Sequence, residues 1–378
     1  MLTCDECGWF GLEEEKTERC PFCGNAHLST SRQMLRPWGF APRNGVEIPY
    51  AQLTEEYSPV QQPLYSTLPD SETMTALGHA KNIRMACRSN QRIIMLNKGV
   101  NDRGFMVCTD CGAAFPGDEW KTLNQVERPY RANYIRSKCK HSNAVNVNLG
   151  YDFVTDMLVL EFRLDEGLIN TDKKNLWLER AAQSLSEALR LVASHTLDIE
   201  FIELVTGYRL RKNQSGFFVD LYMYDSLSSG AGYAVSLSEN AEELLQKTEI
   251  LLSGCTCDSA CHKCLKHYRN QYIHGELDRF AARDLLKWGV DGKTAESLPI
   301  DAQRKLMKPL TSILEVKGYQ LTVSGNRMTI QKETSQKELV VYPAMRSEPH
   351  KTGTIFVSDA FLKYAKPYAV QQIVDEMK

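Results

Sequence analysis

Most of the cysteines in this chain stand in three short groups whose spacing suits metal coordination. Each group offers four soft ligands on turn-rich backbone, as a tetrahedral Zn²⁺ site requires. Three structural zinc ions are therefore predicted, and three such sites favour work on nucleic acids or protein assemblies over small-molecule metabolism. The first group is Cys4, Cys7, Cys20 and Cys23; the second is Cys108, Cys111, Cys139 and His141; the third is Cys255, Cys257, Cys261 and Cys264.

Other interpretations of these residues stay open. Four thiolates also suit an iron–sulfur cluster, so the third group could hold one in place of zinc. His141 could be a surface histidine beside its group. Cys87 belongs to no group and is predicted to be a small buried hydrophobic residue. Gly24 follows the first group directly, where a glycine fits the turn that points amides at the sulfur atoms.

The composition limits the class of protein. The chain has 378 residues, 43% hydrophobic and 24% charged, which is ordinary for a globular protein of two or three domains. Its formal net charge of −2 excludes a chain that is basic throughout. No apolar run is long enough to span a bilayer, and the N-terminus does not resemble a signal peptide. We therefore expect a cytoplasmic protein without membrane contact, in a reducing compartment that favours thiolate–metal sites.

Two runs of basic residues contain no acid and are candidates for binding nucleic acid. One lies between residues 81 and 101, and the other, with interleaved Tyr130 and Tyr134, lies between 128 and 140. Arginine neutralises phosphates and tyrosine stacks on unpaired bases. The alternative is an ordinary solvated surface. A weaker third run comprises Lys263, Lys266 and Arg269. The residues predicted to contact nucleic acid are Arg84, Arg88, Arg92, Arg128, Arg131, Arg136, Lys138 and Lys140.

Hydrophobic periodicity predicts a mixed α/β (α+β) core with inserted zinc-ribbon and zinc-knuckle modules and a small C-terminal α/β appendix. The core has the order β-α-β-β-turn-α. Its expected elements are strands 150–165, 198–205 and 216–225 and helices 175–195, 239–252 and 276–288. The expected domains are a zinc ribbon (1–30), a connector with the second zinc module (31–149), the mixed core with the third group (150–290), and a linker with the C-terminal domain (291–378).

Two acidic residues raise the question of catalysis. Asp225 ends a predicted strand before a glycine-rich turn, and Glu203 lies on the strand expected beside it. Together they could hold a catalytic metal for nuclease chemistry. The favoured alternative is that Asp225 caps the turn through backbone amides, because no lysine or third carboxylate stands at nuclease-like spacing.

One long segment resembles a known family. It joins Tyr224-Asp225, the turn Gly230-Ala231-Gly232-Tyr233, the third cysteine group, Tyr268-X-Asn270 and Leu277-Asp278-Arg279. These motifs are similar to the cysteine-rich C-terminal domain of MrfA-type superfamily 2 DNA helicases, which also occurs in the DrmB subunit of the DISARM antiphage system. With the N-terminal ribbon, the resemblance covers roughly residues 1–290.

The resemblance implies a helicase-associated zinc protein acting in antiphage defence or DNA repair. Its partners would be a superfamily 2 helicase and single-stranded or junction DNA. The chain departs from the family in lacking a GxxxxGK[ST] phosphate loop and an Asp-Glu-X-His box, so ATPase activity is not expected here. It also reads Ser229-Gly230 where paired glycines are common. A purely structural bridge that never touches nucleic acid remains an alternative function.

Overall fold

The computed structural model describes the chain as two compact units. Unit 1 comprises Met1–Thr73, Arg88–Met157 and Tyr224–Gly232, and unit 2 comprises Met74–Cys87, Leu158–Met223 and Tyr233–Lys378. The four-part domain division given above stays a prediction. The residues whose structure is described are 2–4, 6, 9–11, 18–20, 23–30, 32–37, 64–65, 74–125, 139–213 and 215–378.

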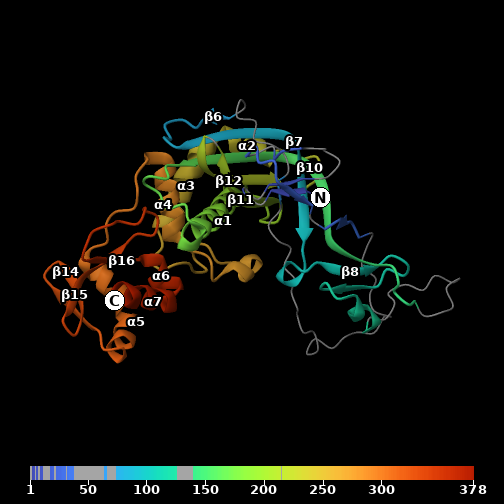
Figure 1. Ribbon diagram of the computed structural model, residues 1–378. Helices are drawn as coiled ribbons and strands as arrows, with labels where there is room; N and C mark the ends of the chain where they lie inside the picture. The colour runs from blue at the N-terminus through green and yellow to red at the C-terminus, as the bar shows by residue number, and fades with distance from the viewer. Residues whose placement is uncertain are drawn as a thin grey trace. The chain divides into compact units, whose positions relative to one another are not determined.

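Within the described residues, the strands form three sheets (Figure 1). Their orders are β2-β1-β3; β11-β12-β10-β7-β5, to which β4, β6, β8 and β9 attach; and β13-β14-β15-β16. The strands are β1 Leu2–Cys4, β2 Phe10–Gly11, β3 Leu28–Thr30, β4 Met34–Leu35, β5 Leu64–Tyr65, β6 Thr75–Ala76, β7 Ile83–Asn97, β8 Phe105–Cys108, β9 Ala114–Pro116, β10 Ala144–Leu164, β11 Leu204–Asn213, β12 Gly216–Asp225, β13 Gln320–Ser324, β14 Arg327–Lys332, β15 Ser335–Tyr342 and β16 Thr354–Ser358.

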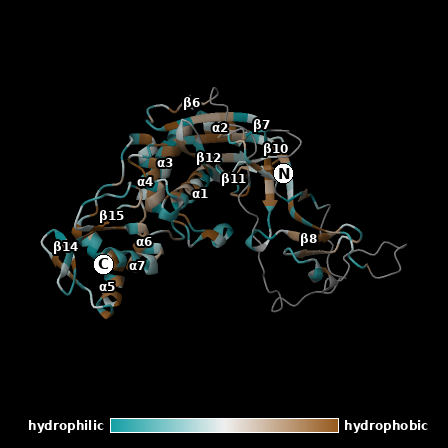
Figure 2. Ribbon diagram, in the orientation of Figure 1, coloured by the Kyte–Doolittle hydropathy of each residue, from teal (hydrophilic) through white to brown (hydrophobic). Residues whose placement is uncertain are grey.

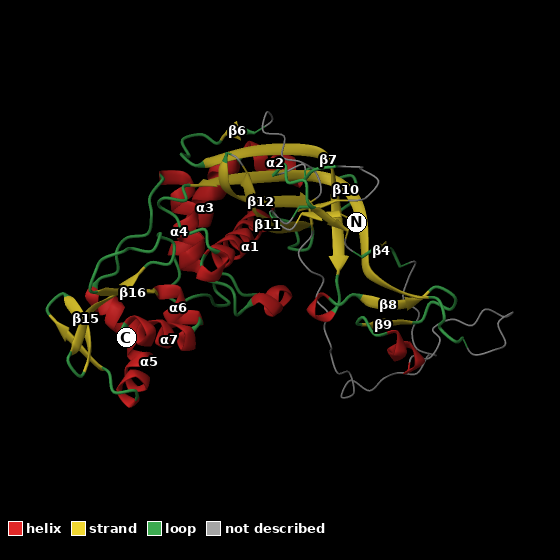
Figure 3. Ribbon diagram, in the orientation of Figure 1, coloured by secondary structure: helices red, strands yellow, loops and turns green. Residues whose placement is uncertain are grey.

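Helices make up the rest of the regular structure (Figure 3). The α-helices are α1 Leu178–Leu197, α2 Tyr233–Glu239, α3 Ala241–Ser253, α4 Arg279–Asp291, α5 Ile300–Val316, α6 Asp359–Tyr364 and α7 Lys366–Glu376. Short 3-10 helices cover Val100–Asp102, Trp120–Gln125, Lys173–Asn175 and Tyr268–Ile273. The predicted mixed α/β class is confirmed. The elements of the core follow the predicted order as β10-α1-β11-β12-turn-α3, and α2 directly after the turn is an additional helix that the sequence did not predict.

The main core of unit 2 lies between its strands and the helices α1, α3 and α4. Alternate residues of β10 point into it, among them Leu158, Leu160 and Phe162, because successive side chains of a strand face opposite sides. The apolar stripe of α1, which includes Leu185 and Leu189, packs in the same cluster. Figure 2 shows the hydrophobic residues running through these elements.

The helix ends follow from local chemistry. The Asp278 carboxylate accepts hydrogen bonds from the amides of Phe280 (2.8 Å) and Ala281 (3.3 Å), so it caps the first turn of α4. Gly292 ends α4 with a φ of 68°, a left-handed conformation that glycine adopts at little cost. The Asp278 cap thus fixes where α4 begins, at the end of the loop that carries the third cysteine group.

The opposite face of β10 carries a buried ion network. Arg211 donates to Asp220 Oδ2 at 3.0 Å and also pairs with Glu161, while Arg209 reaches Asp220 at 3.0 Å and Arg84 reaches Glu161 at 2.6 Å. Asp220 is fully buried and Glu161 is 3% exposed. The two carboxylates are thus neutralised by three guanidinium groups, which is how charges are tolerated away from water.

The C-terminal part of unit 2 has its own apolar cluster. α5 and α7 contribute Leu310 and Ile373, and β14 to β16 contribute Ile330, Val341 and Val357 to it. β15 and β16 run parallel, whereas β13, β14 and β15 pair antiparallel. The predicted C-terminal α/β arrangement is therefore present.

Two sequence expectations were wrong. Residues 198–203 do not continue a strand: Asp198 ends α1 in a left-handed conformation (φ 51°), turns follow, and β11 begins at Leu204. The alternation in 198–205 arises from a turn that faces solvent on one side. Cys87 is exposed, since the period of β7 turns its neighbour Ala86 inward.

Candidate metal centres and nucleic-acid interface

The third cysteine group forms a compact tetrad in unit 2. Its Sγ atoms lie 3.5 Å apart for Cys255 and Cys261, 3.7 Å for Cys257 and Cys264, and 3.8 Å for Cys261 and Cys264. A tetrahedral zinc with Zn–S bonds of ~2.3 Å would separate its sulfur ligands by about 3.8 Å. The donor set and its spacing therefore fit a tetrahedral metal ion.

A buried arginine that sequence reasoning did not single out as functional braces this group. Arg279, 5% exposed, opens α4. Its guanidinium donates to the carbonyls of Leu252 (2.9 Å) and Cys257 (2.9 and 3.1 Å), and its amide donates to that of Ser259 (2.9 Å). It ties the end of α3 and the cysteine loop to α4. The only sequence signal was its place in the family motif.

Without a metal, the four thiols of the third group would not ionise together. The amide of Cys257 lowers the pKa of the Cys255 thiol to about 7. Burial raises the pKa of the Cys264 thiol to about 12. A bound cation would favour the thiolate form of all four sulfur atoms, as zinc does in structural sites.

The second group forms a similar site in unit 1. Cys108 Sγ lies 3.7 Å from Cys139 Sγ, and Cys111 Sγ lies 3.5 Å from His141 Nδ1. Their ligand atoms all lie within 4.8 Å of one another. His141 is 6% exposed, so it is not a surface histidine. Burial raises the pKa of the Cys111 thiol to about 11.

The first and second groups each contain the same kind of backbone turn. The amide of Gly24 donates to the carbonyl of Cys20 (2.9 Å), and that of Gly112 donates to Cys108 (2.8 Å). Both glycines adopt positive φ, 74° and 72°, as the sequence predicted for Gly24. A CxxCG segment thus presents both of its sulfur atoms to one side.

In the first group the structure brings Cys4, Cys20 and Cys23 together. Cys4 Sγ and Cys23 Sγ are 3.5 Å apart, and Trp9, 1% exposed, packs in the same cluster. Cys7, the predicted fourth ligand, lies outside the described residues. The arrangement of the other three is compatible with a zinc ribbon.

The basic residues predicted to contact nucleic acid have different surroundings. Arg84 pairs with Glu161 (2.6 Å) and Arg92 with Asp152 (2.9 Å), so acids from β10 offset part of a run that contains none in sequence. Arg88 is half-buried and Lys140 is exposed. The remaining predicted contacts lie outside the described residues: Arg128, Arg131, Arg136 and Lys138.

The two acids considered for nuclease chemistry have structural partners. The Asp225 carboxylate accepts a hydrogen bond from the amide of Ala231, as expected of a residue that caps the glycine turn. Glu203 accepts from the Tyr233 hydroxyl (2.6 Å) and the Glu200 amide (3.1 Å). Among the described residues, neither belongs to a group of three or more metal-ligand side chains.

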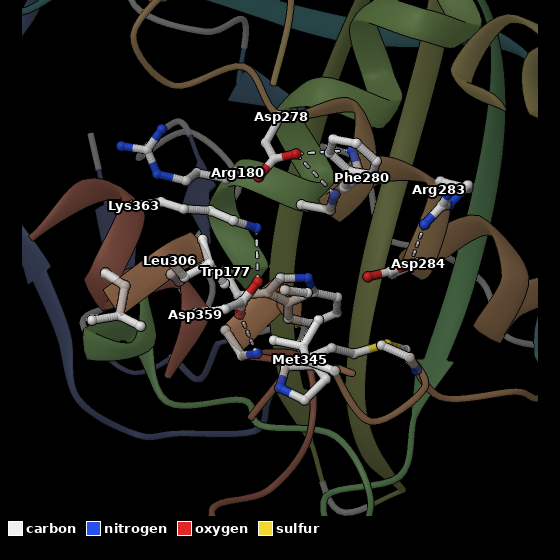
Figure 4. Close-up of a pocket in the computed structure, with 18 of the residues that line it drawn as sticks. Trp177, Arg180, Asp278, Phe280, Arg283, Asp284, Leu306, Met345, Asp359 and Lys363 are labelled. Atoms are coloured by element: carbon white, nitrogen blue, oxygen red, sulfur yellow. Dashed lines mark hydrogen bonds and ion pairs between the residues drawn. The ribbon is translucent and has the colours of Figure 1, made fainter. Parts of the chain in front are cut away.

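Unit 2 also contains a cavity of about 920 Å³ between α4 and the C-terminal part (Figure 4). Three of the acids that line it have partners: Asp359 with Lys363 (2.7 Å), Asp278 with the Tyr364 hydroxyl (2.6 Å), and Asp284 with Arg283 (3.7 Å). Burial raises the pKa of Asp284 to about 6. The lining of the cavity therefore carries charges of both signs.

Comparison with protein families identifies the segment around the third group. Residues 185–265, from α1 to the residue after Cys264, match the family model of the MrfA Zn-binding domain. The third group is thus part of a segment similar to a zinc-binding domain. This match supports zinc over an iron–sulfur cluster at this group.

Two curated proteins are similar over different lengths. Druantia protein DruE of Escherichia coli (strain UMEA 4076-1) is 30% identical over 381 residues, covering 95% of this chain and 20% of DruE. The chain thus spans about a fifth of that relative's length. An uncharacterized protein of Methanocaldococcus jannaschii is 30% identical over 86 residues, covering 22% of this chain and 77% of that protein. Over that stretch the two belong to one family.

Solved structures give weaker similarity. The crystal structure of the DUF1998 helicase MrfA bound to DNA aligns with a TM-score of 0.35 and 12% identity, covering 57% of this chain and 24% of that one. The complex with DNA and AMPPNP gives 0.28 and 10%, covering 56% and 23%. The family assignment rests on the sequence matches.

No helix in the described part of the chain is both long and apolar enough to cross a membrane.

Proposed function

We propose that this chain is a non-catalytic, zinc-stabilised module of a DNA helicase system that binds DNA and docks on a superfamily 2 helicase. The observation that carries the proposal is the cysteine tetrad of the third group inside the segment matching the MrfA Zn-binding domain. MrfA itself is described as a helicase bound to DNA. The motor would lie in a partner or in another part of a longer protein.

Three zinc ions would hold the scaffold. The third group would fix the loop between α3 and α4, and the second group would fix the end of β8 against the start of β10. The first group would close the N-terminal ribbon through Cys7 as fourth ligand. Each ion supplies structural free energy by binding ligands that only the folded chain brings together.

The setting we propose is antiphage defence or DNA repair in the cytoplasm. The motif resemblance to MrfA-type helicases and to DrmB supports this setting, as does the similarity to DruE along nearly all of this chain. Single-stranded or junction DNA is the proposed substrate of the assembly.

The DNA contacts would come mainly from the run 128–140. Lys140 at its end is exposed beside the second group, whereas Arg84 and Arg92 are each paired with an acid. A zinc site that fixes one end of a basic run lowers the entropy lost when the run binds phosphate.

The test of DNA binding is the affinity of the full zinc-loaded chain for labelled single-stranded, forked and duplex DNA across salt concentrations. Reversing the charge of Arg131, Arg136 and Lys140 should weaken binding and reduce the salt slope by about one per lost phosphate contact. Lys317→Glu, an exposed lysine on the C-terminal part, is the matched control. Absence of DNA binding by the parent chain would overturn this part of the proposal.

The test of docking is affinity purification from the native host with nuclease treatment, followed by reconstitution with the recovered helicase. A direct complex that survives nuclease supports docking. If no superfamily 2 helicase is recovered and none copurifies on coexpression, the docking role is wrong.

A further inference from the structure

The turn that follows the third cysteine group exposes two aromatic rings. It is the 3-10 helix Tyr268–Ile273, here called the tyrosine turn. Tyr268 is 85% exposed and Tyr272 is 68% exposed, the largest values for tyrosines in the described part of the chain. By contrast, Tyr222 is 2% exposed and Tyr224 is 1% exposed. Two large aromatic rings that are four residues apart and both exposed to solvent are more typical of a binding surface than of a packed core.

The side chain of Asn270, which is 2% exposed, fixes the tyrosine turn through hydrogen bonds. Its amide group donates to Glu187 Oε2 (3.0 Å) and to the carbonyl of Leu265 (2.9 Å). Its side-chain oxygen accepts from the amide of His267 (2.9 Å) and lies 2.9 Å from His274 Nε2. Both the amide group and the oxygen of this buried side chain thus have partners that hold the turn in place.

His267 anchors the N-terminal end of the turn to the core. Its Nδ1 accepts from the amide of Arg269 (3.2 Å), and its Nε2 lies 3.2 Å from Glu187 on α1. Its ring packs edge-on against Phe201 at 4.3 Å between centroids. With the backbone fixed at both ends, the exposed rings would lose little entropy when they stack on a ligand.

The segment that carries the turn is basic, which suits a nucleic acid; Glu187 of α1, which contacts the turn, is 6% exposed and bonded to His267 and Asn270. Residues 259–275 include Lys263, Lys266 and Arg269 and contain no acid. Lys263 and Arg269 are exposed. A zinc ion bound by four thiolates carries a charge of about −2, which offsets part of this positive charge. The rings, more than phosphate neutralisation, must therefore supply the binding free energy at this place.

We propose that the tyrosine turn is a stacking platform for the unpaired bases of single-stranded DNA, with Tyr268 and Tyr272 as the stacking residues. The proposal rests on the proposed DNA-binding function and names a contact separate from the run 128–140. Arg269, which directly follows Tyr268 in the sequence and is exposed, would hold the adjacent phosphate. Stacking on aromatic rings tolerates any base, so the platform would bind without sequence preference.

The experiment measures binding of the full zinc-loaded chain to a single-stranded oligonucleotide and to a blunt duplex of the same length. Tyr268→Ala together with Tyr272→Ala should weaken single-strand binding at least about tenfold and leave the salt slope unchanged, since stacking releases no counterions. Duplex binding should stay within about twofold, because paired bases offer no free face. An oligonucleotide carrying 2-aminopurine should lose fluorescence on binding the parent chain and not on binding the double variant.

Matched variants separate stacking from other causes. Tyr268→Phe with Tyr272→Phe keeps both rings and should bind as the parent does, and Tyr368→Ala removes a ring that is 57% exposed elsewhere in unit 2. Zinc content of each variant checks that the third group is intact. Parent-like binding by the alanine variant, equal loss on duplex, or loss in the phenylalanine variant would each overturn the platform. If the parent chain binds no DNA, the proposed function itself fails.

Discussion

Asp284 lies on α4 with its carboxyl group at the wall of the cavity in unit 2 (Figure 4). Burial raises its pKa from 3.8 to about 6, with Asp359 and Asp278 adding to the effect and Arg283 opposing it. Folding therefore disfavours the ionised form of this residue. The free energy of unfolding is therefore higher at low pH, where Asp284 is protonated, and it falls as the pH rises through about 6.

Replacing Asp284 by Asn removes this cost. We expect Asp284→Asn to raise the free energy of unfolding above that of the parent chain. This increase should be about 1 kcal/mol larger at pH 8 than at pH 5. Denaturant unfolding with zinc present at both pH values measures it. Asp301→Asn, whose side chain is 81% exposed, should show no such pH dependence. An equal effect of Asp284→Asn at the two pH values would contradict the prediction.

At the scale of elements, the ion network joins β10, β11 and β12 through Asp220 and Glu161. Burial by itself would raise the pKa of Asp220, but Arg209 and Arg211 lower it overall. Asp220→Asn keeps the shape of the side chain and leaves two arginines with one buried counter-charge fewer. We expect a loss of about 3 kcal/mol in the free energy of unfolding, measured by urea titration.

The control for this prediction is an exposed ion pair in the same unit. Lys212 and Glu166 lie 2.7 Å apart with side chains 61% and 41% exposed. Glu166→Gln should change stability by less than about 1 kcal/mol. Similar losses for the two variants would mean that the buried network contributes no more than a surface pair.

Elements were predictable where the hydrophobic pattern was strong. β12 has the bounds expected from sequence, because an apolar run that only Asp220 interrupts lies between turn residues. The strand expected at 198–205 was wrong because an exposed turn happened to alternate acidic and apolar residues. Long-range pairs such as Arg92 with Asp152, 60 residues apart, leave no local signal. Cysteine spacing revealed the candidate ligands, whereas the bracing role of Arg279 depends on the packing of α4.

For the whole molecule, the three cysteine groups predict the metal content. Native mass spectrometry of the full chain should find three zinc ions. Cys264→Ser should lower the content to two and lower the melting temperature, because the third group loses a buried ligand. Cys87→Ser, at an exposed cysteine outside the groups, should keep three. A parent chain with two zinc ions or fewer would show that one group is misassigned.

The third group also differs from the others in how far apart its ligands lie along the chain. All four fall within residues 255–264, whereas Cys108 and Cys139 of the second group are 31 residues apart. Closing a short loop costs less entropy than closing a long one. As the chain folds, the third group can therefore capture its metal before segments that are distant in the sequence have met. We therefore expect zinc to bind the third group before the second one when the unfolded chain refolds with the metal present.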